Sequence, residues 1–250
     1  MAGASGGRRH EVLGASVEEL YAATEAALDR GGNVVIPTFA RERAQEVLYH
    51  LRVATESRRL PRRLPVYLDS PMAISATEIF RNHPECYDAE ARELFRDGRD
   101  PFDMPGLHFT REAAESMALN RIAGGAVIMA GSGMCTGGRV RPHLKHNLWR
   151  KDSAIVFVGY AARGTLARRI IDGAKTVKLF GEEIRVQASI HTINGFSAHA
   201  DQAELLAWHA HTGAKRTFLV HGEPDTMQSF AGQLMNTAVE MPAHHQSFAL

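Results

Sequence analysis

Cysteine is scarce in this chain, and its scarcity excludes a scaffold built on disulfides. The two cysteines among 250 residues, Cys86 and Cys135, stand far apart in the sequence. This usage favours a reducing compartment, and we expect a cytoplasmic location. Residues 1–10 are rich in glycine and lack the apolar stretch of a secretory signal. Apolar runs such as 126–130 and 154–158 are too short to cross a bilayer, so we expect no membrane partner.

An excess of charge of one sign is also lacking. Lys and Arg number 29 against 28 Asp and Glu, which gives a formal net charge of +1. Overall basicity therefore cannot drive binding to nucleic acid, and any affinity for phosphate must come from local clusters. The hydrophobic content of 44% supplies enough apolar material for a core, and the length allows one large domain or two smaller ones. Thirteen histidines are more than such a chain usually carries.

Short apolar strands alternate with helices through the first two thirds of the chain. We expect strands at 33–37, 65–68, 126–130 and 154–159. Helices are expected at 16–30, 40–55, from 72 onward, 111–118, 138–145 and 165–172, with Ser16 and Ser70 as N-caps. Residues 82–107 are rich in Pro, Gly and Asp and are interpreted as an irregular surface lobe. This alternation predicts the α/β class, with a doubly wound parallel sheet.

The pattern changes after Lys175. Short strands are expected at 176–180, 183–187, 189–192 and 217–220, and helices at 201–211 and 225–236. We therefore predict two domains, 11–181 and 182–250, with the change near residues 181–183.

Polar or small residues follow each of the four buried strands. They include Thr38, Ser70, Ser132 with Gly133, and Gly159. The carboxyl ends of parallel strands meet the amino ends of helices along one edge, which offers free N–H groups to phosphate. Arg41, Arg43, Arg139 and Arg141 stand within about a turn of these points. At any single position, a turn glycine or a capping hydroxyl is the commoner role, but the set favours a phosphate-bearing ligand.

A nucleophile in the loop after residue 130 is an alternative. Ser132 could attack a substrate, although its surroundings do not match G-x-S-x-G. Cys135 could act as a thiolate, because a helix start lowers the pKa of a thiol. The loop also lacks the G-K-[ST] ending of a Walker A motif. An acyl- or phosphate-handling enzyme that uses Cys135 or Ser132 therefore stays open.

Two histidines stand where strands give way to loops. His199 lies in F-S-A-H-A-D, between a strand and a helix, and His221 follows the strand 217–220 in H-G-E. Neutral imidazole binds zinc, and protonated imidazole can donate a proton to a leaving oxygen. Taken singly, each histidine would more often be a capping or hydrogen-bonding residue.

Six ordered segments resemble the β-CASP family of RNA-processing nucleases with a metallo-β-lactamase fold. G-F-S-A-H-A-D and L-V-H-G-E are similar to its motifs B and C. Four more segments match its prokaryotic members, and the resemblance runs from about residue 8 to the end: I-P-T-F-A-R-E-R-A-Q-E, Y-L-D-S-P-M-A, A-G-S-G-M-C-T-G-G-R and V-G-Y-A-A-R-G-T-L-A-R-R. The resemblance implies a β-CASP domain followed by a partial metallo-β-lactamase αββα segment.

The resemblance also implies an activity and a site. The activity is hydrolysis of RNA phosphodiesters with two zinc ions, in which His221 would bind zinc and His199 would face the scissile phosphate. The residues expected to contact RNA or phosphate are Thr38, Arg43, Ser70, Ser132, Gly133 and Arg139.

The principal metal motif of the family, H-x-H-x-D-H, occurs nowhere in the 250 residues. Because one ligand cannot hold a dinuclear site, we expect the chain to be inactive or weak alone. A missing N-terminal half or a second copy of the chain would then be its partner. A non-catalytic RNA-binding module is the second hypothesis.

Overall fold

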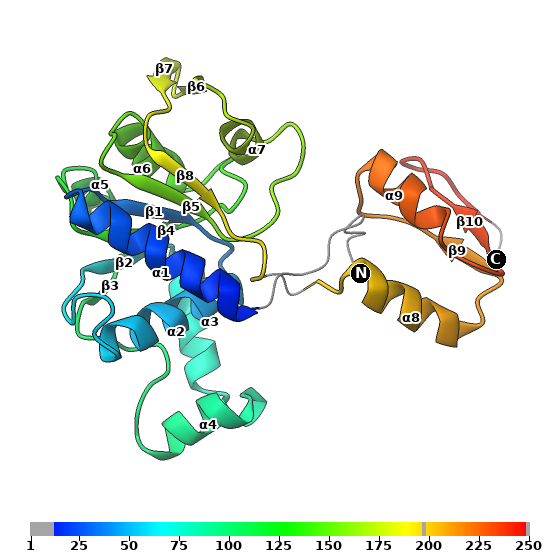
Figure 1. Cartoon of the computed structure of the whole chain (residues 1–250), viewed down its shortest axis with the longest axis horizontal. Helices are drawn as coiled ribbons and strands as arrows, with labels where there is room; N and C mark the ends of the chain where they lie inside the picture. Colours follow the sequence, from blue (N-terminus) through cyan, green and yellow to red (C-terminus); the bar gives the residue numbers. More distant parts are fainter. Residues whose placement is uncertain (1–12, 197–198, 249–250) are drawn as a thin grey trace. The chain divides into compact units, whose positions relative to one another are not determined.

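The computed structural model describes residues 13–196 and 199–248, which fall into two compact units (Figure 1). The first unit is Leu13–Phe196, and the second contains the described residues that follow it. Residues 8–12 of the family resemblance, and Ser197 and Ala198 of its motif B, lie outside the described residues. Within the described ranges, no helix has the length and apolar character needed to cross a membrane.

A six-stranded sheet forms the centre of the first unit. Its strands are β1 (Val34–Pro37), β2 (Val66–Asp69), β3 (Leu107–Phe109), β4 (Val127–Ala130), β5 (Ala154–Phe157) and β8 (Ser189–Thr192). Their spatial order is β3-β2-β4-β1-β5-β8, and every neighbouring pair is parallel. The predicted doubly wound parallel sheet is therefore confirmed.

Helices cover both faces of this sheet, which is why its central strands β1, β4 and β5 are apolar throughout rather than alternating. On one face lie α1 (Leu13–Asp29), α2 (Arg43–Glu56) and α3 (Pro71–Arg81), packed on Val34 and Ile36 (Figure 1). On the other face lie α6 (Val140–Asn147) and α7 (Leu166–Ile171), packed on Val35 and Ile155. The sheet is thus buried between two apolar layers.

Helix starts follow the predicted caps in one case and depart from them in another. Ser70 caps α3, since its Oγ accepts a hydrogen bond from the N–H of Ala73 at 3.3 Å. The predicted cap Ser16 is wrong, because α1 begins at Leu13 and Ser16 is buried inside it. Its hydroxyl instead accepts a hydrogen bond from the N–H of Gly195 at 3.1 Å. Ser16 therefore ties the segment that follows β8 to helix α1.

The segment 82–107 is more ordered than its composition suggests. It contains a 3-10 turn at Pro84–Cys86 and the helix α4 (Ala89–Arg96), capped by Asp88. Tyr87 packs edge-on against Phe95 and Phe102, with ring centroids 5.9 and 6.1 Å away. The prediction of an irregular lobe was wrong for α4, because these aromatic contacts stabilise a helix between breaker residues.

The two strands predicted at 176–180 and 183–187 are confirmed as β6 (Thr176–Leu179) and β7 (Glu182–Arg185), and the structure shows that they pair antiparallel. Strand β8, however, pairs with β5 in the large sheet. The compact units consequently divide after Phe196, later than the domain boundary predicted near residues 181–183.

The second unit holds two helices and two strands. They are α8 (Gln202–Thr212), β9 (Arg216–Phe218), α9 (Pro224–Ala231) and β10 (Ala238–Glu240), and the strands are parallel. Asp201 and Glu204 form a capping box at the start of α8, and Gly213 ends it in the left-handed conformation. Among the described residues of this unit, Phe230 is the one buried hydrophobic side chain.

Candidate functional site

The carboxyl ends of β1, β2 and β4 bring the predicted polar residues together. Pro37 and Asp69 are both in register with Ala130, so the residues after these three strands lie side by side. A Cβ atom placed on Gly131 would lie 3.7 Å from the carbonyl oxygen of Thr38 and 3.8 Å from Oγ of Ser70. The sheet thus assembles one polar edge from three separate sequence segments.

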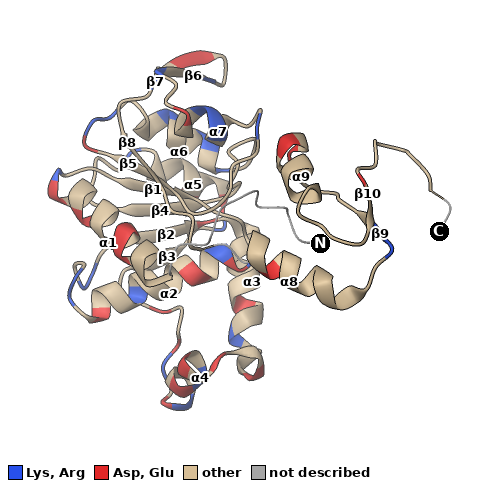
Figure 2. Ribbon diagram, turned by 45° about the vertical axis from the view of Figure 1, so that its right-hand side comes forward, with Lys and Arg blue, Asp and Glu red and all other residues tan. Residues whose placement is uncertain are grey.

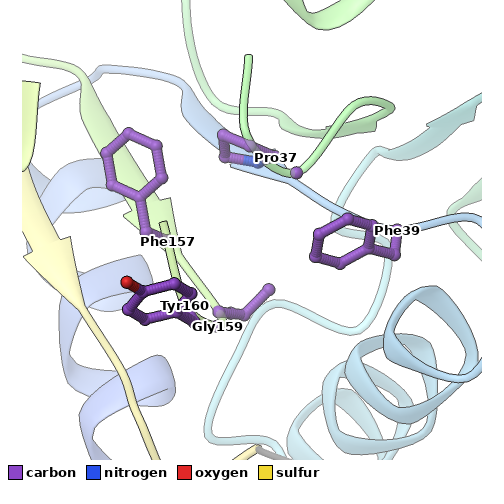
Figure 3. Close-up of a pocket in the computed structure, with 7 residues that line it drawn as sticks. Pro37, Phe39, Phe157, Gly159 and Tyr160 are labelled. Carbon is purple, nitrogen blue, oxygen red and sulfur yellow. The ribbon is translucent and has the colours of Figure 1, made fainter. Parts of the chain in front are cut away.

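Two exposed aromatic rings border a pocket at this edge. Phe39 is 44% exposed and Tyr160 is 54% exposed, and Figure 3 shows them on two sides of the pocket, with Gly159 between them. A Cβ atom on Gly133 would lie 2.9 Å from the Phe39 ring, so the ring lies against the backbone of that residue. The pocket is lined by Pro37, Phe39, Gly133, Phe157, Val158, Gly159 and Tyr160. The sequence did not reveal these two rings as a pair, because each follows a different strand.

Thr38 and Ser132 present hydroxyl groups in different states. Thr38 is 1% exposed, and its Oγ1 has no hydrogen-bond partner among the described residues. A buried hydroxyl without a hydrogen-bond partner destabilises the fold, and a bond to a ligand oxygen or a water would remove that penalty. Oγ of Ser132 lies 3.3 Å from the carbonyl oxygen of Gly137 and 3.4 Å from its nitrogen. Thr38 therefore has a buried hydroxyl without a partner, whereas the half-buried hydroxyl of Ser132 is already bonded within its own loop.

The two predicted arginines are already engaged within the protein. Arg43 is 9% exposed and forms an ion pair with Glu46. Arg139 donates to Oδ1 of Asp69 at 2.8 Å and to the carbonyl oxygens of Thr110 and Arg111 at 3.0 and 2.7 Å. Their roles as RNA contacts stay predictions, and Arg139 clearly also fixes the loops around it.

A buried network beneath the edge escaped the sequence analysis. Asp69 is fully buried, and its Oδ2 accepts hydrogen bonds at 2.6 Å from Oγ of Ser116 and from Nε2 of His143. Burial raises the pKa of Asp69, but the hydrogen bonds from His143, Ser116 and Arg139 outweigh it and hold that pKa below its ordinary value. This carboxylate therefore anchors the loop after β4 to the end of β2.

The loop after β4 does not present a reactive thiol. Cys135 is fully buried, and burial raises the pKa of its thiol to about 12. A thiol that is protonated at neutral pH and shielded from solvent is a poor nucleophile. The hypothesis of a Cys135 nucleophile is therefore wrong. The hydroxyl of Ser132 meets only the backbone of Gly137 within the described ranges, so the structure offers no base to activate it.

The two motif histidines lie together in the second unit. The ring centroids of His199 and His221 are 6.5 Å apart, with the ring planes tilted by 51°. His199 stands shortly before α8, and His221 follows β9 with a left-handed φ of 65°. A non-glycine residue in that conformation carries backbone strain, which is common at functional sites. The turn after β9 thus brings the two imidazoles near each other.

These two imidazoles do not complete a zinc site. Zinc in proteins usually takes four ligands, at least three of them from the protein. Across residues 13–196 and 199–248, no cluster of three or more His, Cys, Asp or Glu side chains is placed to hold a metal. The residues described here do not fit a complete zinc centre.

The parallel sheet, its polar and aromatic carboxyl edge and the histidine pair define an α/β protein of the class that binds ligands where strands end. Comparison with known families narrows this class. A model of the Beta-Casp domain matches residues 44–170, about half of the chain, and a model of the Zn-dependent metallo-hydrolase RNA specificity domain matches residues 183–243. The chain belongs to the β-CASP family of metallo-β-lactamase-fold nucleases.

Individual proteins of known name are also similar in sequence to this chain. Ribonuclease TTHA0252 of Thermus thermophilus is 44% identical over 225 residues, which cover 90% of this chain and 51% of the relative. Transcription termination factor FttA is 36% identical over 205 residues in Pyrococcus abyssi and 33% identical over 221 residues in Methanocaldococcus jannaschii. These matches cover 31% and 34% of the two factors. The chain thus spans about half the length of the ribonuclease and about a third of the termination factors.

Proposed function

We propose that this chain binds single-stranded RNA at the carboxyl edge of its sheet and contributes two histidines to a zinc-dependent ribonuclease. The observation that carries the proposal is the pocket between Phe39 and Tyr160, next to the polar ends of β1 and β4. Unpaired bases stack on aromatic rings, and this stacking is available only when the strand is not paired. The family relationship and the names of the relatives support RNA as the nucleic acid.

In this proposal the backbone of the RNA lies against the polar residues at the same edge. A small shift of the loop after β1 would let the buried Oγ1 of Thr38 donate to a phosphate oxygen, which would satisfy a buried hydroxyl that has no partner in the described residues. Ser70, Ser132 and Gly133 would border the path. Arg43 and Arg139 would add positive potential from behind their ion pairs.

The histidines would act on the scissile bond. His199 would donate a proton to the departing oxygen, because an imidazolium can protonate a leaving group near neutral pH. His221 would be one of the ligands of the two zinc ions that the family resemblance implies. The ring centroids lie 6.5 Å apart, so the two side chains are near enough to act on one bound group.

The remaining zinc ligands would come from beyond the described residues of this chain, either from an N-terminal half or from a second copy. We therefore expect the purified chain to bind RNA without cleaving it. Zinc analysis after dialysis should give well under two zinc ions per chain. Two tightly held ions, or metal-dependent cleavage by this chain that survives His221→Ala, would contradict this part of the proposal.

Alanine substitutions at the pocket test RNA binding. Phe39→Ala and Tyr160→Ala should each weaken the binding of a labelled single-stranded oligonucleotide by about 1–3 kcal/mol, measured by fluorescence anisotropy. Trp149→Ala is the matched control, because Trp149 is also 54% exposed but precedes β5 at the opposite edge of the sheet. If all three variants bind RNA as tightly as the unchanged chain, the pocket is not the binding site.

A further inference from the structure

A second pocket lies between the loop after β4, helices α6 and α7, and strand β6. Three of its lining residues are basic: Arg141 from α6, Arg169 from α7 and Lys178 from β6. Figure 2 shows Lys and Arg positions gathered on α7. The other lining residues are Cys135, Thr136, Gly164 and Leu166, so no acidic side chain lines the pocket.

The three cations of this pocket lack acidic partners, whereas their neighbours have them. Arg168, next in the chain to Arg169, forms an ion pair with Asp172, and Lys145 forms one with Glu182 at 2.6 Å. Within the part of the chain that the structure describes, no ion pair involves Arg141, Arg169 or Lys178. Even Glu183, which is in register with Lys178 across the hairpin, does not form one. Cations that line one pocket without ion-pair partners repel one another, and a bound anion reduces that repulsion.

Arg141 is held in place and still has an unused donor. Its guanidinium carbon lies 5.0 Å from the centroid of the Phe180 ring, a cation–π contact. Its Nε is buried and has no hydrogen-bond partner among the described residues. A guanidinium fixed by stacking, with free donors, is suited to bidentate binding of phosphate oxygens.

We propose that Arg141, Arg169 and Lys178 form a phosphate-binding site separate from the pocket between Phe39 and Tyr160. Its ligand is a phosphate group, whose charge the three cations that line the pocket neutralise. That group belongs either to the backbone of RNA that continues past the loop 131–139 or to a small free phosphate compound. The site does not require the proposed function, because the charges and the unused donor stand on their own.

Calorimetric titration with inorganic pyrophosphate tests the site in the full chain. The triple variant Arg141→Gln, Arg169→Gln and Lys178→Gln should weaken pyrophosphate binding by about tenfold or more, since it removes several charge-assisted hydrogen bonds. The double variant Arg169→Gln and Lys178→Gln changes only exposed side chains and keeps the fold, and it should also weaken binding.

A matched control removes the same charge elsewhere. Arg58, Arg62 and Arg63 are exposed and lie between α2 and β2, at the other edge of the sheet. Changing all three to Gln should leave pyrophosphate binding as it is in the unchanged chain. The proposal would be overturned if the double and triple variants bound pyrophosphate as tightly as the unchanged chain. It would also be overturned if the control variant lost as much affinity as they do.

Salt titration of RNA binding identifies the source of the phosphate. If the site holds the RNA backbone, the triple variant should reduce the slope of log affinity against log salt by about 2, because each contact on a single strand contributes about 0.7. If the site holds a small phosphate compound, pyrophosphate binding falls while the RNA slope stays unchanged. If the triple variant loses pyrophosphate binding while even the unchanged chain does not bind RNA, this site is upheld and the proposed function is refuted. Normal RNA binding with pyrophosphate binding unchanged by the triple variant would do the reverse.

Discussion

At the scale of single residues, Asp69 at the end of β2 connects several elements. Its carboxylate accepts hydrogen bonds from Ser116, His143 and Arg139, and Nδ1 of His143 lies 3.0 Å from Oδ1 of Asn120. The network lies directly beneath the loop that carries Ser132 and Gly133. The shape of the candidate RNA edge therefore depends on a residue that is itself inaccessible to a ligand.

Replacing Asp69 should be costly. Asp69→Ala leaves a buried arginine contact and two further donors without an acceptor, and should lower the free energy of unfolding by about 3–5 kcal/mol. Urea unfolding followed by circular dichroism measures the change. Asp172→Ala is the control, because Asp172 forms an exposed ion pair and its loss should alter stability little. A similarly small effect at both positions would show that the network contributes little to stability.

The lowered pKa of Asp69 gives this stabilisation a definite pH dependence. A carboxylate whose folded pKa lies below its unfolded value of about 3.9 stabilises the protein fully above that pH. The contribution is lost as pH falls through the lower folded pKa. The difference in unfolding free energy between the unchanged chain and Asp69→Asn should therefore shrink below about pH 4. A difference that grows on acidification would contradict the assigned direction.

At the scale of elements, the connection between β4 and α6 is unusually constrained. Gly138 has a left-handed φ of 74°, and a Cβ atom there would lie 2.3 Å from the carbonyl oxygen of Gly131. Gly137 next to it has open space around the same position. The two neighbouring glycines thus form a natural pair for comparison.

Gly138→Ala should destabilise the protein by at least about 1–2 kcal/mol, from the left-handed conformation alone. It should also displace Ser132, whose N–H lies 2.9 Å from the added carbon. Gly137→Ala should change stability by no more than about 1 kcal/mol. Thermal unfolding of both variants measures the contrast, and equal melting temperatures would refute it.

Local signals in the sequence predicted the elements that depend on neighbouring residues. The apolar runs gave β1, β2, β4 and β5, and Ser70 with Pro71 marked the start of α3. Local signals did not predict the elements that form through contacts with residues distant in the sequence. Helix α4 depends on aromatic packing around Tyr87, and β10 forms only because β9 lies next to it.

The candidate site likewise has features that the sequence predicts and features that it does not. The polar residues after strands could be predicted, because parallel strands place their carboxyl ends at one edge. The pairing of Phe39 with Tyr160, and of Arg141 with Lys178, could not, since each pair joins segments far apart in the chain. Burial of Cys135 was equally invisible in the sequence, and it argues against the thiol nucleophile that the sequence left open.

At the scale of the whole molecule, the second unit has a small core. Phe230 is its one buried hydrophobic residue in the described ranges, while Trp208 is 69% exposed and Met235 is 75% exposed. Exposed apolar surface of this kind favours association with another surface. We therefore expect this chain to self-associate as its concentration rises.

Light scattering after size-exclusion chromatography measures this association. The double variant Trp208→Gln and Met235→Gln should shift the population towards the monomer. Met117→Gln with Met72→Gln is the control, because these side chains are 69% and 74% exposed but belong to the first unit. A chain that stays monomeric at every concentration would contradict the expectation, as would an equal shift in the control.

The strand order of the large sheet also has a consequence for the timing of folding. Strand β1 has β4 and β5 as its neighbours, and β2 does not touch it. During synthesis, residues 34–37 therefore emerge from the ribosome long before either neighbour exists. At about 5–20 residues per second, this apolar strand waits for several seconds without a partner. Helix α1 is made just before β1 and is the nearest apolar surface on which this strand can pack. We therefore expect the nascent chain to depend most on chaperones in that interval.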